Sequence, residues 1–82
     1  MTLKNDILSP AQSRGARGML GMSQTDLAVA ADVSRQTVVD FERGARTPHR
    51  NNLLAIRRAL EEAGIEFIPE NGGGAGVRFR ER

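Results

Sequence analysis

Arginine is the residue type with the clearest chemistry in this 82-residue chain, and its spacing is uneven. Eleven of the twelve basic residues are arginine. Residues 35–58 carry six of them against Asp40 and Glu42, a net charge of +4, whereas residues 1–34 balance three basic with three acidic residues. A guanidinium group binds phosphate or guanine through two parallel hydrogen bonds. Residues 35–58 are therefore a candidate anion-binding segment, although a GC-rich genome also produces arginine-rich chains.

Residues that carry catalysis or bind metals are too few and too scattered to predict an active site. The chain has no cysteine and a single histidine, His49, so neither thiolate chemistry nor an ordinary zinc-ligand spacing is available. Glu61 and Glu62 are expected on the solvated side of a helix. The GGGAG run at 72–76 lacks the lysine of a phosphate-binding loop. We therefore expect no enzymatic activity, no cofactor and no metal.

The length of the chain allows one small domain and little else. A deep cavity would hollow out a core that is already marginal at 82 residues. The first ten residues, MTLKNDILSP, lack the apolar run of a signal peptide, and no segment approaches the roughly 20 apolar residues of a membrane span. We expect a soluble cytoplasmic protein with a short N-terminal arm at residues 1–8.

Capping residues divide residues 9–64 into four short helices. The predicted N-caps are three serines and one threonine: Ser9, Ser23, Ser34 and Thr47. Glycines are expected to end three of the helices: Gly21, Gly44 and Gly64. The second and third helices have about nine residues each and a three-residue link, which is the layout of a helix-turn-helix. An ordinary helical hairpin shares that layout.

The last 18 residues change from a helical to an alternating pattern. Ile65 and Phe67 share one face of a first short strand, and Val77 and Phe79 share one face of a second. A lone two-stranded hairpin is marginal in water, so this one must pack on the fourth helix, on another copy of the chain or on another protein. The predicted fold class is mainly α, with four short helices, a central helix-turn-helix and a C-terminal β-hairpin or strand pair.

Several sequence features in the segment from Arg17 to Leu60 together indicate a known family. Its features are Ser23-Gln24 opening the second helix, Leu27-Ala28 inside it, the Val33-Ser34 turn, Val38 in the third helix and the run FERG at 41–44. In these features the chain resembles the lambda-repressor-like helix-turn-helix family, of the phage repressor and Cro or xenobiotic-response-element type. The resemblance implies that residues 9–64 bind double-stranded DNA and that the third helix is the recognition helix.

The resemblance implies base contacts from the exposed face of that helix. With Val38 and Phe41 buried, the face consists of five residues: Arg35, Gln36, Val39, Asp40 and Arg43. Arg35 can donate both arms to guanine, and Gln36 can both donate to and accept from adenine. Asp40 can accept from cytosine or orient Arg35 or Arg43. A solvated polar face is the simpler alternative.

Phosphate contacts would fix the position of the recognition helix on DNA. Family members use the glutamine at the position of Gln24 to hold the DNA backbone, in a first turn that already favours anions. Ser34 and Thr37 can add hydroxyl contacts, although both also have structural uses at the start of the third helix. Three exposed arginines are expected to follow the helix along the backbone: Arg43, Arg46 and Arg50. A solvated charge run is again the alternative.

Arg17 and Glu42 match two family positions that have a structural role. The resemblance implies that they form a largely buried ion pair between the first and third helices. Breaking a fully buried pair costs about 3–5 kcal/mol, because one charge is left uncompensated. We therefore expect Glu42 to support stability more than base preference.

The resemblance implies a sequence-specific transcriptional regulator, a repressor, that works at the nucleoid and reads a near-palindromic operator as a homodimer. The tail at 65–82 is the predicted dimerisation element, because pairing between subunits would bury four apolar residues: Ile65, Phe67, Val77 and Phe79. The alternative is an antitoxin that binds a toxin protein and also represses its own promoter. Both functions need the same DNA-reading face.

Overall fold

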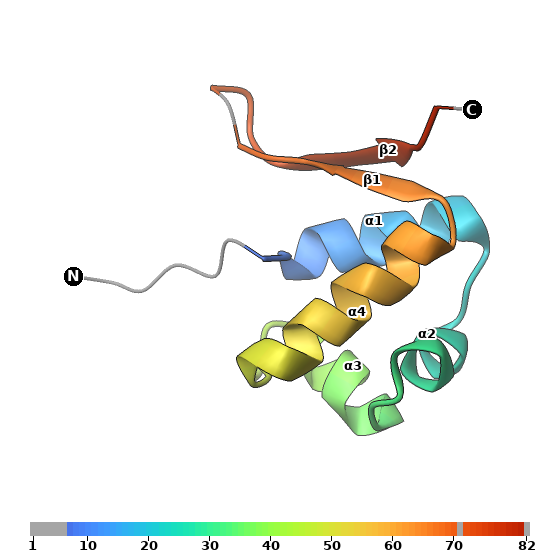
Figure 1. Ribbon diagram of the computed structural model, residues 1–82. Coiled ribbons are helices and arrows are strands. Elements are labelled where there is room, and N and C mark those ends of the chain that lie inside the picture. The colour runs from blue at the N-terminus through green and yellow to red at the C-terminus, as the bar shows by residue number, and fades with distance from the viewer. Residues whose placement is uncertain (1–6, 71, 82) are drawn as a thin grey trace.

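The computed structural model describes residues 7–70 and 72–81, in which four helices precede a two-stranded antiparallel sheet (Figure 1). The elements are α1 (Pro10–Leu20), α2 (Gln24–Ala31), α3 (Arg35–Glu42), α4 (Arg50–Glu62), β1 (Ile65–Ile68) and β2 (Gly76–Phe79). The predicted mainly helical class with a C-terminal hairpin is confirmed. No helix within the described residues has the length and apolar character needed to cross a membrane.

Serine side chains cap the first three helices, as the sequence predicted. The hydroxyl of Ser9 accepts from the backbone N–H of Gln12 at 3.0 Å, and the Gln12 side chain accepts in return from the Ser9 N–H at 2.9 Å. Ser23 and Asp26 form the same reciprocal pair at the start of α2. Each pair satisfies two backbone donors that the helix itself leaves free, so these starts are encoded locally.

The prediction that Thr47 caps the fourth helix is wrong. His49 is the N-cap of α4, its side chain makes no capping hydrogen bond, and its carbonyl oxygen accepts the first helical bonds. The preceding loop is held elsewhere, because the backbone N–H groups of Ala45 and Arg46 both donate to the carbonyl oxygen of Asp40. These two bonds fix the start of the loop to the last turn of α3, and α4 begins only after His49.

The hydrophobic core collects side chains from every helix and from β1. The largest fully buried ones are Leu8, Leu27, Val38, Phe41, Ile56, Leu60 and Ile65. Ile7 and Leu8 belong to this core, although the sequence prediction assigned them to an N-terminal arm. The rest of that arm, residues 1–6, lies outside the described residues. Two apolar side chains directly before the Ser9 cap therefore pin the beginning of α1.

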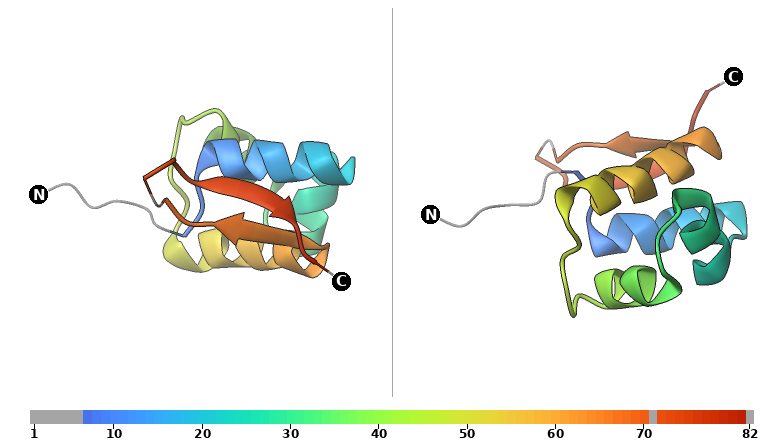
Figure 2. Two further views of the ribbon diagram at one scale, coloured as in Figure 1. Left: turned by 90° about the horizontal axis from the view of Figure 1, so that it is seen from above. Right: turned by 60° about the horizontal axis from the view of Figure 1, so that its bottom comes forward.

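The hairpin lies across α1 and α4, on the side of the molecule opposite α3 (Figures 1 and 2). Its register opposes Ile65 to Phe79 and Phe67 to Val77, so the two predicted pairs lie on the same face of the hairpin. Ile65 and Phe67 are buried in the core of the same chain. Of the three ways of packing the hairpin, the structure uses the chain's own helices, which removes these two side chains from any surface open to a partner.

Candidate nucleic-acid interface

One face of α3 anchors the helix and the other is open. Val38, Phe41 and Glu42 are buried, whereas Arg35 and Gln36 are exposed at the N-terminal end of the helix. The views in Figure 2 show α3 beside α2 and away from the hairpin. A short helix held by its inner residues can offer its first turn to a large ligand without rearrangement of the core. Arg35 and Gln36, the residues predicted to bind bases, are thus accessible.

Asp40 joins two neighbours on the exposed side of α3. Its Oδ1 accepts from Gln36 Nε2 at 2.8 Å and from Arg43 Nη2 at 3.2 Å. The sequence allowed Asp40 either a contact to cytosine or an orienting contact to Arg35 or Arg43. The structure pairs Asp40 with Arg43 and also with Gln36. Val39, the remaining residue of the predicted face, is half-buried.

The hydroxyl groups of Ser34 and Thr37 already serve the start of α3. Ser34 Oγ accepts from the Thr37 backbone N–H at 3.0 Å and lies 2.7 Å from Thr37 Oγ1, where either hydroxyl can donate. The bond between the two hydroxyls uses one of their two protons and the cap uses none, so one proton is still available to a phosphate. The two hydroxyls therefore stabilise the start of α3, and their contact with phosphate stays a prediction.

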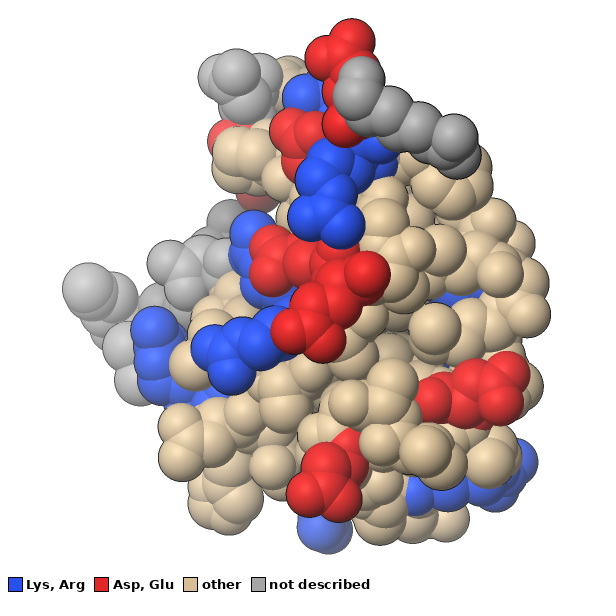
Figure 3. All heavy atoms as spheres, turned by 45° about the vertical axis from the view of Figure 1, so that its right-hand side comes forward, with Lys and Arg blue, Asp and Glu red and all other residues tan. Residues whose placement is uncertain are grey.

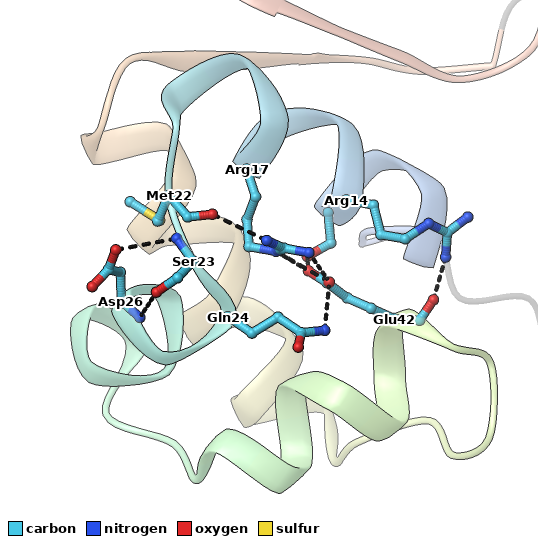
Figure 4. A network of polar contacts seen from close by, with 8 residues as sticks. Arg14, Arg17, Met22, Ser23, Gln24, Asp26 and Glu42 are labelled. Carbon is cyan, nitrogen blue, oxygen red and sulfur yellow. Dashed lines mark hydrogen bonds and ion pairs between the residues drawn. The ribbon is translucent and has the colours of Figure 1, made fainter.

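Glu42 is the centre of the polar network drawn in Figure 4. Arg17 Nη2 donates to Glu42 Oε1 at 2.7 Å, and Ser13 Oγ donates to Glu42 Oε2 at 2.6 Å. Arg17 also donates from Nη1 to the carbonyl oxygen of Met22 at 3.0 Å, and Arg14 donates to the backbone carbonyl of Glu42. The ion pair therefore ties α1, the loop after α1 and α3 together, with a carboxylate that is only 2% exposed.

The charged form of Glu42 is favoured despite its burial. Burial alone raises the pKa of this carboxyl group, but hydrogen bonds from Arg17, Ser13 and Gln24 together hold the pKa below its ordinary value. The hydrogen bond to Glu42 likewise raises the pKa of Arg17. Both partners thus remain ionised at neutral pH.

The Gln24 side chain joins this network and is also partly exposed to solvent. Its Nε2 donates to Glu42 Oε1 at 3.2 Å, and the side chain is half-buried in the first turn of α2 (Figure 4). One amide proton is used in this bond, and the second proton and the amide oxygen are not. The side chain is therefore held at the junction of α2 and α3, where the resemblance implied a DNA-backbone contact.

A hollow of about 400 Å³ lies between α3 and the loop that leads into α4. Its lining includes Gln36 and Asp40 from α3, Arg46 from the loop and Asn52 from the first turn of α4. Arg43, Arg46 and Arg50 are all exposed around this part of the surface. The sequence reading did not single out Asn52, because its proximity to α3 depends on the path of the loop and leaves no local signal.

Arginines of α4 and β2 form ion pairs with neighbouring glutamates. Figure 3 shows acidic and basic side chains interspersed in a band beside a broad uncharged area. Arg78 pairs with Glu66 at 2.8 Å, and Arg57 pairs with Glu61 at 3.0 Å. The Arg78 hydrogen bond also lowers the pKa of Glu66. Ion pairing weakens the attraction of these arginines for phosphate, as it does for Arg43 beside Asp40. Arg35, Arg46 and Arg50 are exposed on α3 and on the segment that follows it.

Comparison with known proteins decides the family. The sequence matches the helix-turn-helix family HTH_3 over residues 14–67, from within α1 to within β1. The chain belongs to this lambda-repressor-like helix-turn-helix family. No curated protein sequence matches the chain. The predicted family is therefore confirmed. Membership of this family indicates a DNA-binding transcriptional regulator.

The solved structures that are similar to this helix-turn-helix protein include a repressor domain and a controller protein. The DNA-binding domain of the P22 C2 repressor, determined in solution by nuclear magnetic resonance, is 31% identical with a TM-score of 0.61, over 71% of this chain and 76% of that one. The restriction-modification controller protein C.Esp1396I is 28% identical with a TM-score of 0.58, over 71% and 79% of the two chains. Both likenesses extend over most of each chain.

Proposed function

We propose that the protein is a sequence-specific transcriptional repressor that reads a near-palindromic operator as a homodimer, with α3 in the major groove. The observation that carries this proposal is the anchoring of α3. Buried Val38, Phe41 and Glu42 fix the helix while Arg35 and Gln36 stay exposed at its first turn. Membership of the helix-turn-helix family and the likeness to a repressor domain support the same conclusion. The proposed function involves no catalysis.

Selection of bound sequences from random duplex DNA, with sizing of the complex, tests this function directly. We expect a sequence with two related half-sites about one helical turn apart, bound by two chains. An antitoxin would select DNA in the same way but would also co-purify with a second protein from its source. Recovery of no preferred sequence would contradict the proposal.

Replacing Arg35 by alanine is expected to lower operator affinity by about 1–3 kcal/mol, with the loss concentrated on one base pair of each half-site. The reason is that an exposed guanidinium at the start of α3 can bind guanine through two hydrogen bonds. Binding titrations against operators changed at each position measure this effect. Arg46→Ala is the matched control, since loss of a phosphate contact weakens all sequences similarly and reduces the salt slope by about one unit. Equal losses for Arg35→Ala on operator and random DNA would exclude a base contact.

The dimer needs an interface that leaves both α3 helices facing the same DNA. Contact between the outer faces of two hairpins would point the recognition helices in opposite directions, because the hairpin and α3 lie on opposite sides (Figure 1). The exposed large apolar residues of the described chain are Met19, Val29 and Phe79, from the last turn of α1, from α2 and from the end of β2. These elements lie toward one flank in Figure 1. We therefore assign dimerisation to this flank, which retains Phe79 from the predicted set.

Phe79→Ser is expected to weaken the dimer by about 2 kcal/mol, roughly 30-fold, because it removes a large aromatic contact from the proposed interface. Phe79 is 57% exposed in the single chain, so the substitution should leave the melting temperature of the monomer nearly unchanged. Sedimentation over a range of concentrations measures the shift. Truncation after Gly64 is a poorer test, because it also removes Ile65 and Phe67 from the core. A Phe79→Ser protein that dimerises like the parent would contradict this interface.

A further inference from the structure

The side chains of Gln36 and Asp40 form a pair on the exposed face of α3. We propose that Asp40 is a positioning residue that fixes the amide of Gln36 for adenine, so that the operator requires an A·T pair where Gln36 enters the groove. This inference rests on the proposed function and adds the identity of one base pair to it. Asp40 itself then makes no base contact.

The chemistry of the carboxylate determines which way the Gln36 amide points. An ionised aspartate only accepts hydrogen bonds, so it must receive the amide NH₂ and not the amide oxygen. The 2.8 Å bond from Gln36 Nε2 to Asp40 Oδ1 has this sense. The residues are four apart on one helix, which is the spacing at which Gln and Asp side chains meet. Asp40 thus removes the amide rotation that would otherwise let a glutamine adapt to several bases.

Asp40 is itself well held, which is what a positioning residue needs. Its side chain is 21% exposed, and the same Oδ1 receives Arg43 Nη2 at 3.2 Å. Its backbone carbonyl accepts from Ala45 and Arg46, so the loop after α3 fixes the main chain at this point. A group locked by its neighbours can hold a recognition side chain close to one geometry.

The fixed amide presents a pattern that only adenine matches fully. With one amide proton donated to Asp40, Gln36 still offers its Oε1 as an acceptor and its second N–H as a donor. Adenine supplies the N6 amino donor and the N7 acceptor, which gives two hydrogen bonds. Guanine and thymine place a carbonyl acceptor where Gln36 Oε1 needs a donor, and cytosine supplies the donor without the N7 acceptor. The preference should therefore be for adenine over all three other bases.

Binding measurements with the full chain test this assignment. Operators carrying each of the four base pairs at every position are titrated with the parent, Gln36→Ala, Asp40→Ala and the double variant. We expect Asp40→Ala to reduce the adenine preference about tenfold at one position of each half-site, and Gln36→Ala to reduce it at the same position. In the double variant, Asp40→Ala should add no further change in base preference, because its effect passes through Gln36.

A charge-matched control separates positioning from electrostatics. Asp32→Asn removes one negative charge at the end of α2, in a left-handed conformation that asparagine also tolerates, and should leave the adenine preference intact. Thermal unfolding of Asp40→Ala should match the parent, since alanine is a good helix former. Retention of the adenine preference in Asp40→Ala, or a change at a second base pair in the Gln36→Ala background, would overturn the inference. If the parent selects no sequence at all, it is the proposed function that fails.

Discussion

Replacing Glu42 by alanine is expected to lower the free energy of unfolding by about 3–5 kcal/mol, the typical loss when one partner of a buried ion pair is removed. The substitution leaves Arg17, Ser13 and Gln24 without the acceptor that they share. It also releases α3 from α1, because Glu42 is the residue through which the network joins these helices. In a domain of this size the melting temperature should fall by more than about 12 °C. Thermal unfolding followed by circular dichroism measures the change.

Two control variants sharpen this test. Glu62→Ala removes an exposed glutamate from the last turn of α4 and should alter the melting temperature by only a degree or two. Glu42→Gln keeps the side-chain shape and one acceptor, so its loss should be smaller than that of Glu42→Ala. An unchanged melting temperature for Glu42→Ala would rule out the structural role of the ion pair.

The stabilisation from Glu42 should also depend on pH in a definite direction. The pKa of this carboxyl group is lower in the folded than in the unfolded chain, so its contribution is complete above the unfolded value, about 4.3. The contribution is lost as the pH falls from that value through the folded pKa. The difference in melting temperature between the parent and Glu42→Gln should therefore be constant near neutral pH and shrink below about pH 4. A difference that grows on acidification would contradict the lowered pKa.

Local signals in the sequence predicted most of the helical layout. The Ser9, Ser23 and Ser34 caps depend on residues at most three positions away, so a single pass along the chain can identify them. Gly21 ends α1 in the left-handed conformation that the pattern required. The family resemblance supplied the one long-range contact that was predicted, between Arg17 and Glu42, because no local pattern relates residues 25 positions apart.

Features that depend on tertiary packing were missed. Nothing near Thr47 in the sequence reveals that the loop would be drawn toward Asp40 and that His49 would start α4. The burial of Ile7 and Leu8 likewise follows from the position of the hairpin and α4 around the start of α1. The bond between Gln36 and Asp40 is different, because its four-residue spacing was visible in the sequence.

Replacing Phe67 by alanine is expected to cost about 3 kcal/mol of folding free energy, at the lower end for a large aromatic side chain in a core. Phe67 is only 7% exposed, belongs to the hydrophobic core, and carries the Arg57 guanidinium over its ring at 5.0 Å from the centroid. Truncation removes the apolar burial and this cation–π contact together. Urea denaturation should show the loss as a lower midpoint with a similar slope.

The concentration dependence of that loss separates a core residue from an interface residue. Removing a side chain packed inside one chain lowers stability by the same amount at every protein concentration. Removing a dimer contact instead lowers stability only where the dimer is populated, because association stabilises the fold by mass action. Phe67→Ala should therefore behave in the first way and Phe79→Ser in the second. If the loss for Phe67→Ala instead appears only at concentrations where the parent dimerises, and the variant sediments as a monomer, Phe67 belongs to the interface between chains, and the hairpin does not complete the core of its own chain.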